Sequence, residues 1–239
     1  MKQIMTTFLI DVAIIGTVVF CGWRGYKNGL IRGVFGVVSL IVSLLVANIA
    51  AQAYSDEAKE VLMPFVSGIL DSTITKMGEQ GVEYQVLAHD HEPGDIEFGT
   101  AYTALRQLGL PEAASVNIAA QSVESLKDNE DEKYFPDIIA DKLTTTASFV
   151  AVFGIAFLLI AIVFAVIGNL VGFVFSLPGL KLVDIIAGSA LGLLKGVIIV
   201  YTIAVIIRYF GLLIISTLEG TTILNHIVNN NPIANMLGV

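Results

Sequence analysis

Four apolar segments constrain this chain more than any other feature of its sequence. They cover residues 8–23, 30–53, 149–177 and 182–216, and the third contains no charged side chain. A helix needs about 20 residues to cross the hydrocarbon core of a bilayer, which is roughly 30 Å thick. Since 55% of all residues are hydrophobic and 14% are charged, a water-exposed surface could not accommodate them. The segments predict an all-α membrane protein with four transmembrane helices.

Charge divides the chain in the same places. Residues 51–145 hold 18 of the 21 acidic residues but 6 of the 13 basic ones, so their net charge is −12 and that of the remainder is +4. Nucleic acid and anionic lipid headgroups repel a region of that sign. We therefore expect an extramembrane insert that stands away from the lipid surface, and no nucleic-acid partner.

The insert has helical periodicity of its own. Residues 56–80 place apolar side chains near one face, with Pro64 as a kink or a break. Residues 98–108 and 111–126 are predicted as two further helices, and a last one begins near Asp137 and continues into the third apolar segment. The expected organisation follows the chain in order: transmembrane hairpin 1–54, acidic helical insert 55–145, transmembrane hairpin 146–218 and a short C-terminal tail 219–239.

Basic residues in the short turns predict the orientation. Arg24, Lys27 and Arg32 lie in or beside the turn between the first two segments, and Lys181 lies between the last two. Because lysine and arginine in short loops are retained on the cytoplasmic side, both turns are expected there. The two termini and the insert are then extracytoplasmic.

Two glycine stretches form an internal repeat. Each has three glycines four residues apart and a base just before the last: Gly25, Gly29, Arg32 and Gly33, then Gly188, Gly192, Lys195 and Gly196. On a membrane helix this spacing makes a flat face that a neighbouring backbone can approach closely, so these glycines are candidate packing residues. Both copies would enter the membrane from the same side, which predicts two helical hairpins in parallel orientation. The alternative is a chance match between glycine-rich helices.

Charged side chains in or beside the apolar segments are the candidate functional residues, because charge is costly at membrane depth. They are Asp11, Arg32, Asp184, Lys195 and Arg208. Asp184 and Lys195 are eleven residues apart and would share a helix face about 16 Å apart, too far to pair. Asp11 is a candidate counter-ion. Alternatively, these side chains lie at the membrane interfaces and snorkel to water.

No motif indicates an enzyme. The run His89-Asp-His91-Glu92 carries metal-binding side chain types without the spacing of a known metal site. Cys21 is the single cysteine, so an intramolecular disulfide is excluded. We expect no catalytic residue, no cofactor and no metal.

These residues resemble the colicin V production protein (CvpA) family of bacterial membrane proteins. The resemblance rests on Asp11, on the Gly25–Gly33 turn, and above all on the spacing of proline, aspartate, glycines and lysine in residues 177–196. Residues 105–112 resemble the inserts of Gram-positive members. The family implies a multi-pass protein of the cell (inner) membrane that is required for producing or exporting a peptide toxin and for maintaining the envelope. It brings no catalytic residues.

Two functions are therefore expected. The first is a non-enzymatic membrane component that supports toxin (colicin V-type) production, export or envelope homeostasis through membrane or extracytoplasmic protein partners, with a second copy of the chain among the candidate partners. The alternative is a small oligomeric channel or transporter in which Asp11, Asp184, Lys195 and Arg208 line a polar path.

Overall fold

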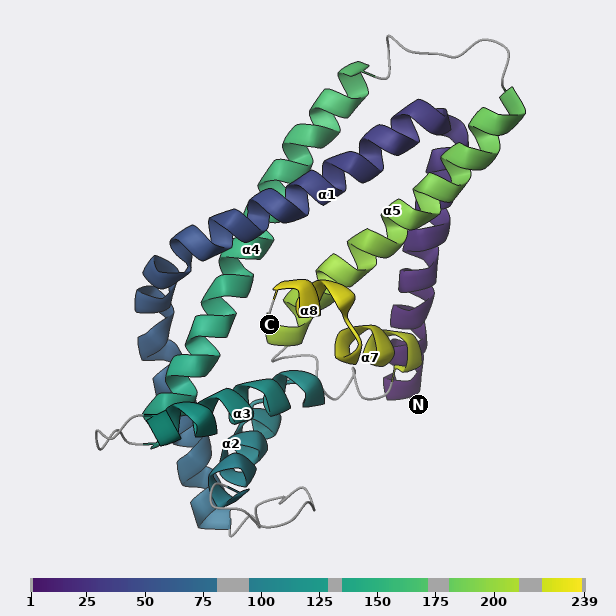
Figure 1. Ribbon diagram of the computed structural model, residues 1–239. Coiled ribbons are helices and arrows are strands. Elements are labelled where there is room, and N and C mark those ends of the chain that lie inside the picture. The colour runs from purple at the N-terminus through teal and green to yellow at the C-terminus, as the bar shows by residue number, and fades with distance from the viewer. Residues whose placement is uncertain (1, 81–94, 129–134, 172–180, 211–220, 238–239) are drawn as a thin grey trace.

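The computed structural model describes residues 2–80, 95–128, 135–171, 181–210 and 221–237, and every regular element within them is an α-helix (Figure 1). The all-α prediction is confirmed for these ranges. The helices are α1 (Lys2–Gln80), α2 (Asp95–Gln107), α3 (Glu112–Asp128), α4 (Phe135–Val171), α5 (Lys181–Phe210), α7 (Thr222–Asn229) and α8 (Pro232–Leu237).

Helix α1 consists of two helical segments joined at Gly29. This residue has φ 75° and ψ 179°, a backbone conformation that is essentially restricted to glycine. The purple N-terminal segment of α1 and the blue segment after it therefore run back from a common turn (Figure 1). The first two apolar segments predicted from the sequence both lie in α1, one on each side of Gly29.

Helices α1, α4 and α5 are long and apolar enough to cross a membrane, over Phe8–Gly78, Phe135–Gly168 and Asp184–Ile207. Helix α1 packs along both other helices. Their shared core includes Leu40 and Leu44 from α1, with Phe153 and Phe157 stacked at 6.2 Å on α4.

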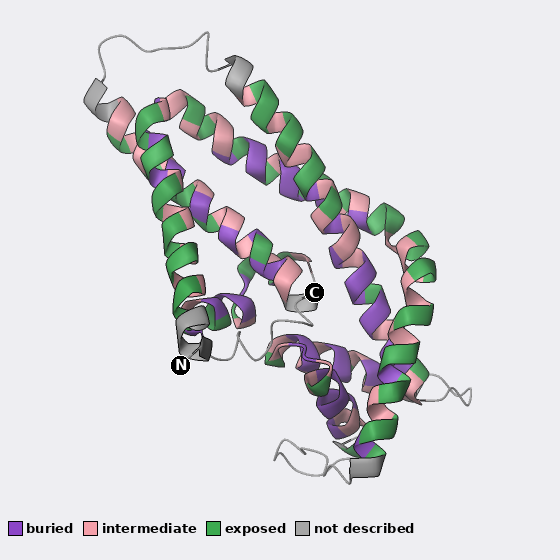
Figure 2. Ribbon diagram, turned by 180° about the vertical axis from the view of Figure 1, so that it is seen from behind, coloured by how far each residue is buried: buried purple, intermediate pink, exposed green. Residues whose placement is uncertain are grey.

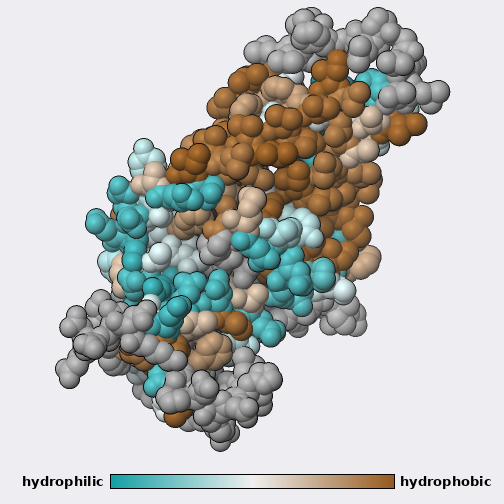
Figure 3. All heavy atoms as spheres, in the orientation of Figure 1, coloured by the Kyte–Doolittle hydropathy of each residue, from teal (hydrophilic) through white to brown (hydrophobic). Residues whose placement is uncertain are grey.

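Large apolar side chains also cover the outside of this region. Only 17% of the most apolar part of α4 is buried, and Ile155, Leu158 and Val163 are each more than half exposed. Exposed residues line the outer sides of the long helices (Figure 2), and the apolar surface covers one part of the molecule while polar residues gather in the other (Figure 3). A bilayer is the solvent that suits such a surface.

The insert has a hydrophobic core of its own. Leu70, Met77, Leu105, Ile118 and Ile139 are buried together where α2 and α3 pack between the C-terminal end of α1 and the start of α4. The predicted helices correspond to the end of α1, to α2, to α3 and to the start of α4. No helix ends at the expected boundaries 54/55 and 145/146, because α1 and α4 run through them.

The C-terminal residues fold back on the membrane helices. Leu224, Ile227 and Val228 of α7 are buried with Val200 and Ala204 of α5. The expected tail, residues 219–239, contains two short helices, α7 and α8, and residues 230–231 between them are not helical.

Candidate functional site

The two glycine stretches meet at the crossing of α1 and α5. A Cβ at Gly188 would lie 2.7 Å from the carbonyl oxygen of Gly25 and 2.9 Å from the Cα of Gly29. A Cβ at Gly192 would lie 3.0 Å from the Cα of Gly25. These neighbours are backbone atoms, so the helices touch without side chains between them.

The outer glycines of each stretch have closely packed neighbours as well. A Cβ at Gly196 would lie 2.9 Å from the Cα of Val18 and 3.0 Å from the Cβ of Cys21. A Cβ at Gly33 would lie 3.1 Å from the Cβ of Leu191. The crossing therefore extends over several turns of both helices.

Asp184 completes the turn at Gly29. It lies in the first turn of α5, and its carboxylate accepts a hydrogen bond of 2.7 Å from the backbone N–H of Leu30. Leu30 is the first residue after the break in α1, so Asp184 caps the new helical segment. A Cβ at Gly29 would lie 2.8 Å from the Asp184 Cγ. Glycine at position 29 thus supplies both the turn and the space for the cap.

Asp11 caps a different helix. Its carboxylate accepts hydrogen bonds from the backbone N–H groups of Thr222, at 3.2 Å, and Leu224, at 3.4 Å. Both belong to the first turn of α7, where Thr221 at the N-cap position makes no side-chain capping bond. Among the described residues Asp11 forms no ion pair with Lys195.

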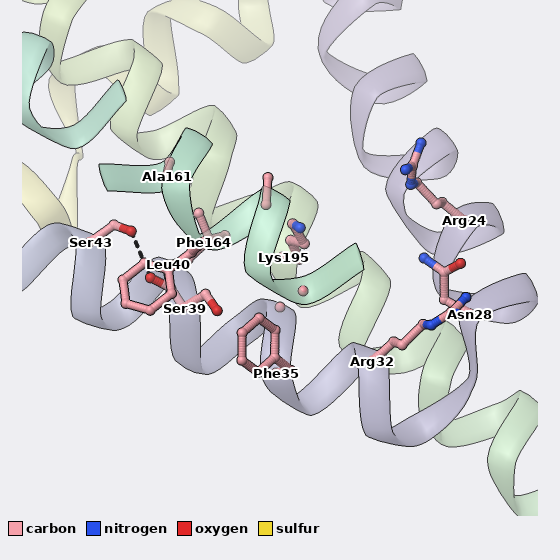
Figure 4. A pocket seen from close by; sticks show the side chains of 13 residues that line it. Arg24, Asn28, Arg32, Phe35, Ser39, Leu40, Ser43, Ala161, Phe164 and Lys195 are labelled. Carbon is pink, nitrogen blue, oxygen red and sulfur yellow. Dashed lines mark hydrogen bonds between the residues drawn. The ribbon is translucent and has the colours of Figure 1, made fainter. Parts of the chain in front are cut away.

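A cationic cavity lies between α1, α4 and α5. It has a volume of about 160 Å³, which is room for several water molecules. Its basic lining residues are Arg24, Arg32 and Lys195, and no lining residue among those described is acidic. In Figure 4, Lys195 lies between a group formed by Arg24, Asn28 and Arg32 on one side and a group formed by Ser39, Leu40 and Ser43 on the other.

Some polar groups of the cavity wall form hydrogen bonds with one another. The Ser43 hydroxyl donates a hydrogen bond of 2.7 Å to the Ser39 carbonyl. Lys195 is half-buried, and a Cβ at Gly36 would lie 3.5 Å from its ammonium nitrogen. Lys195 makes no ion pair with any acidic side chain in the described ranges.

Of the five charged candidates named from the sequence, the cavity brings together Arg32 and Lys195. Asp11 and Asp184 lie elsewhere, as helix caps. Arg208 belongs to α5, but its side chain is outside the described residues, as is the run His89–Glu92. Within the described ranges no group of three or more side chains could hold a metal ion.

Sequence reasoning missed several residues of this site. Arg24 and Asn28 are four residues apart on the first segment of α1, and Ser39 and Ser43 are four residues apart on the second. This spacing is the signal of a polar helix face. Asn231 does not line the cavity, and no spacing in the sequence indicated its structural role. It is buried, its side-chain amide donates to the Tyr201 carbonyl at 2.9 Å, and its oxygen accepts from the Ile233 N–H at 3.0 Å.

The apolar helices, the glycine crossing and the capped helix starts together define an α-helical membrane protein. The family model described as colicin V production protein matches residues 114–232, about half of the chain. The chain therefore belongs to the colicin V production protein family, and a role of that general kind follows. No curated protein and no solved structure matches it.

The matched residues include Asp184, Lys195 and the whole of α5. They leave out α1, although α1 supplies the other face of the glycine crossing and most of the cavity wall.

Proposed function

We propose that the chain is a non-enzymatic, four-span protein of the bacterial inner membrane that supports toxin production, toxin export or envelope homeostasis by binding partner proteins through its insert. The spans are the two segments of α1 and the apolar parts of α4 and α5, arranged as two hairpins in parallel orientation. The lipid bilayer is its solvent, and no nucleic acid takes part.

The observation that carries this proposal is the continuity between membrane helices and insert. Helix α1 runs on to Gln80 and α4 begins at Phe135, and both contribute to the insert core. Lys59 on α1 and Asp141 on α4 also pair there at 2.7 Å. A partner bound to the insert would thus act directly on two membrane helices, which suits a coupling component.

The proposed orientation places the insert outside the cytoplasm. The basic turn around Gly29 and the insert lie toward opposite ends of the molecule (Figure 1), and basic turns stay inside. The test uses a Cys21→Ser background with single cysteines at exposed Glu112 and exposed Lys27, probed in intact cells with an impermeant thiol reagent. Labelling at 112 and not at 27 is expected. The opposite pattern would invert the topology.

Partner binding is tested with a photo-crosslinking side chain at Glu124, which is exposed on α3, and a matched one at Val163, which is exposed on α4. We expect discrete protein adducts at position 124 and none at 163. Glutamine at both Glu112 and Glu124 should weaken the adducts and the rescue of a strain that lacks the gene. Full rescue by a chain that no longer forms adducts would refute the proposal.

A channel or transporter remains the second candidate, and the observation that favours it is the cation-lined cavity around Lys195. Ion flux into liposomes that contain the purified protein and an ion-sensitive dye distinguishes the two functions. The partner-binding role predicts no flux above that of empty liposomes. Flux that falls on Lys195→Gln substitution would establish the channel instead.

A further inference from the structure

The cationic cavity gathers positive charge at a place where the described part of the protein supplies no lining acid. Arg24 and Arg32 come from the two segments of α1 on either side of Gly29, and Lys195 comes from α5. The carboxylates of the apolar segments 8–23 and 182–216, Asp11 and Asp184, accept hydrogen bonds from helix N-termini. Neither contributes to the cavity wall.

The Lys195 side chain brings a charge from inside the membrane to this place. Its backbone lies eleven residues after Asp184, about 16 Å along α5, and Asp184 sits beside the turn of α1. Its ammonium lies beside Gly36, which follows Gly29 by seven residues, so the side chain reaches back toward the interface. Arg24 and Arg32 are exposed on either side of the turn, whereas Lys195 is half-buried. Cations in a membrane segment are normally paired or face a functional site, and an anion beside Lys195 and Arg24 would offset the partial desolvation of the ammonium and the repulsion between these two bases.

The rest of the wall indicates what kind of anion fits. Phe35, Leu40 and Phe164 add apolar surface beside the bases. Ala165 of α4 lines the cavity and is itself exposed, next to exposed Val166. The cavity thus borders the lipid-facing side of α4. A small soluble anion would not contact the apolar wall favourably. A lipid would contact both parts of the wall, the bases through its charged headgroup and the apolar residues through its acyl chains.

We propose that this cavity binds the phosphate headgroup of an anionic phospholipid, with Arg24, Arg32 and Lys195 around the phosphate and Asn28 and Ser39 as additional polar contacts. Basic pockets between membrane helices bind anionic headgroups in this way. The inference rests on the membrane arrangement proposed above and is independent of any partner of the insert.

The test is native mass spectrometry of the purified full chain with phosphatidylglycerol and phosphatidylcholine of identical acyl chains. Phosphatidylglycerol should bind in preference to phosphatidylcholine. Lys195→Gln and Arg24→Gln should each weaken phosphatidylglycerol binding by about fivefold or more, the effect of one basic residue near an anionic lipid surface. Lys195→Arg keeps the charge and should retain most of the binding, which separates loss of the site from loss of the fold.

Lys27→Gln is the matched control. Lys27 lies in the same basic turn, but its ammonium sits 3.9 Å from the centre of the exposed Trp23 ring and it does not line the cavity. Its removal should change binding by less than twofold. Equal losses in the Lys27 and Lys195 variants would show general electrostatic attraction and overturn the site, as would unchanged binding in Lys195→Gln.

A parallel titration with inorganic phosphate identifies the source of the phosphate. Displacement of phosphatidylglycerol only far above millimolar phosphate is the expected result. Saturable binding of inorganic phosphate at micromolar concentration, lost in Lys195→Gln, would assign the cavity to a soluble anion and overturn the lipid. The partner adducts at position 124 report on the insert separately, so each proposal can fail alone.

Discussion

Adding one methyl group at Gly188 should loosen the crossing of α1 and α5. The alanine Cβ would lie 2.7 Å from the Gly25 carbonyl oxygen, where ordinary contact begins at 3.4 Å. The helices must therefore separate locally by about 0.7 Å, since the atoms in the way are backbone and cannot rotate aside. The same shift would stretch the 2.7 Å bond from Leu30 to Asp184 to the limit of hydrogen bonding.

The magnitude follows from these two terms. Overpacking costs about 1–3 kcal/mol, and a lost hydrogen bond costs roughly 1 kcal/mol more. We expect Gly188→Ala to lower the free energy of unfolding by about 2–4 kcal/mol. The assay is reversible unfolding of the purified chain in mixed micelles, by titration with a denaturing detergent.

Gly16→Ala is the matched control. Gly16 lies in the first segment of α1, and a Cβ there would meet nothing within 4 Å. Alanine should leave the stability unchanged or raise it by up to about 1 kcal/mol through its helix propensity. If Gly188→Ala proved as stable as Gly16→Ala, the backbone contact between α1 and α5 would be wrong.

Three further predictions concern single contacts. Asp184→Ala should lower the free energy of unfolding by about 1–3 kcal/mol, because it removes a helix cap. Asp184→Asn keeps an acceptor oxygen and should lower it by less in the same detergent titration. Equal losses in the two variants would contradict the capping role. Asn231→Ala should speed hydrogen exchange in α8 by about tenfold, because two capping bonds and a bond to α5 disappear, whereas exposed Asn230→Ala should not. Gly196→Cys should form a disulfide with Cys21 on mild oxidation, since the two Cβ atoms would start 3.0 Å apart and relax to about 3.8 Å; a chain that stayed reduced would argue against this part of the crossing.

The helices of this protein can be predicted from its sequence because the bilayer and the insert core each require a recognisable composition or periodicity. A bilayer requires long apolar runs, and the insert core requires apolar residues at helical spacing, such as Leu70 and Met77 in α1 or Ala101 and Leu105 in α2. These regularities are local. They are readable without knowing which helix packs on which.

The break in α1 shows what local reading cannot supply. Gly25, Gly29 and Gly33 have the same spacing and similar neighbours, yet only Gly29 has the non-helical backbone. What distinguishes it is the contact with Asp184, which binds the next residue, Leu30, from 154 residues away along the chain. The cavity was missed for the same reason, since its bases come from α1 and α5 and meet only through the crossing.

The capping carboxylates Asp11 and Asp184 also set an order of events during synthesis. The Asp11 carboxylate and its partner Thr222 are separated by 211 residues, and a ribosome that adds about 5–20 residues per second needs roughly 10–40 s to make that length. During that time the final partner of the Asp11 carboxylate has not been made. The turn at Gly29 likewise lacks its contact with Asp184. The first part of α1 is therefore made before the contacts that complete its fold exist, and the last helices to be made supply them.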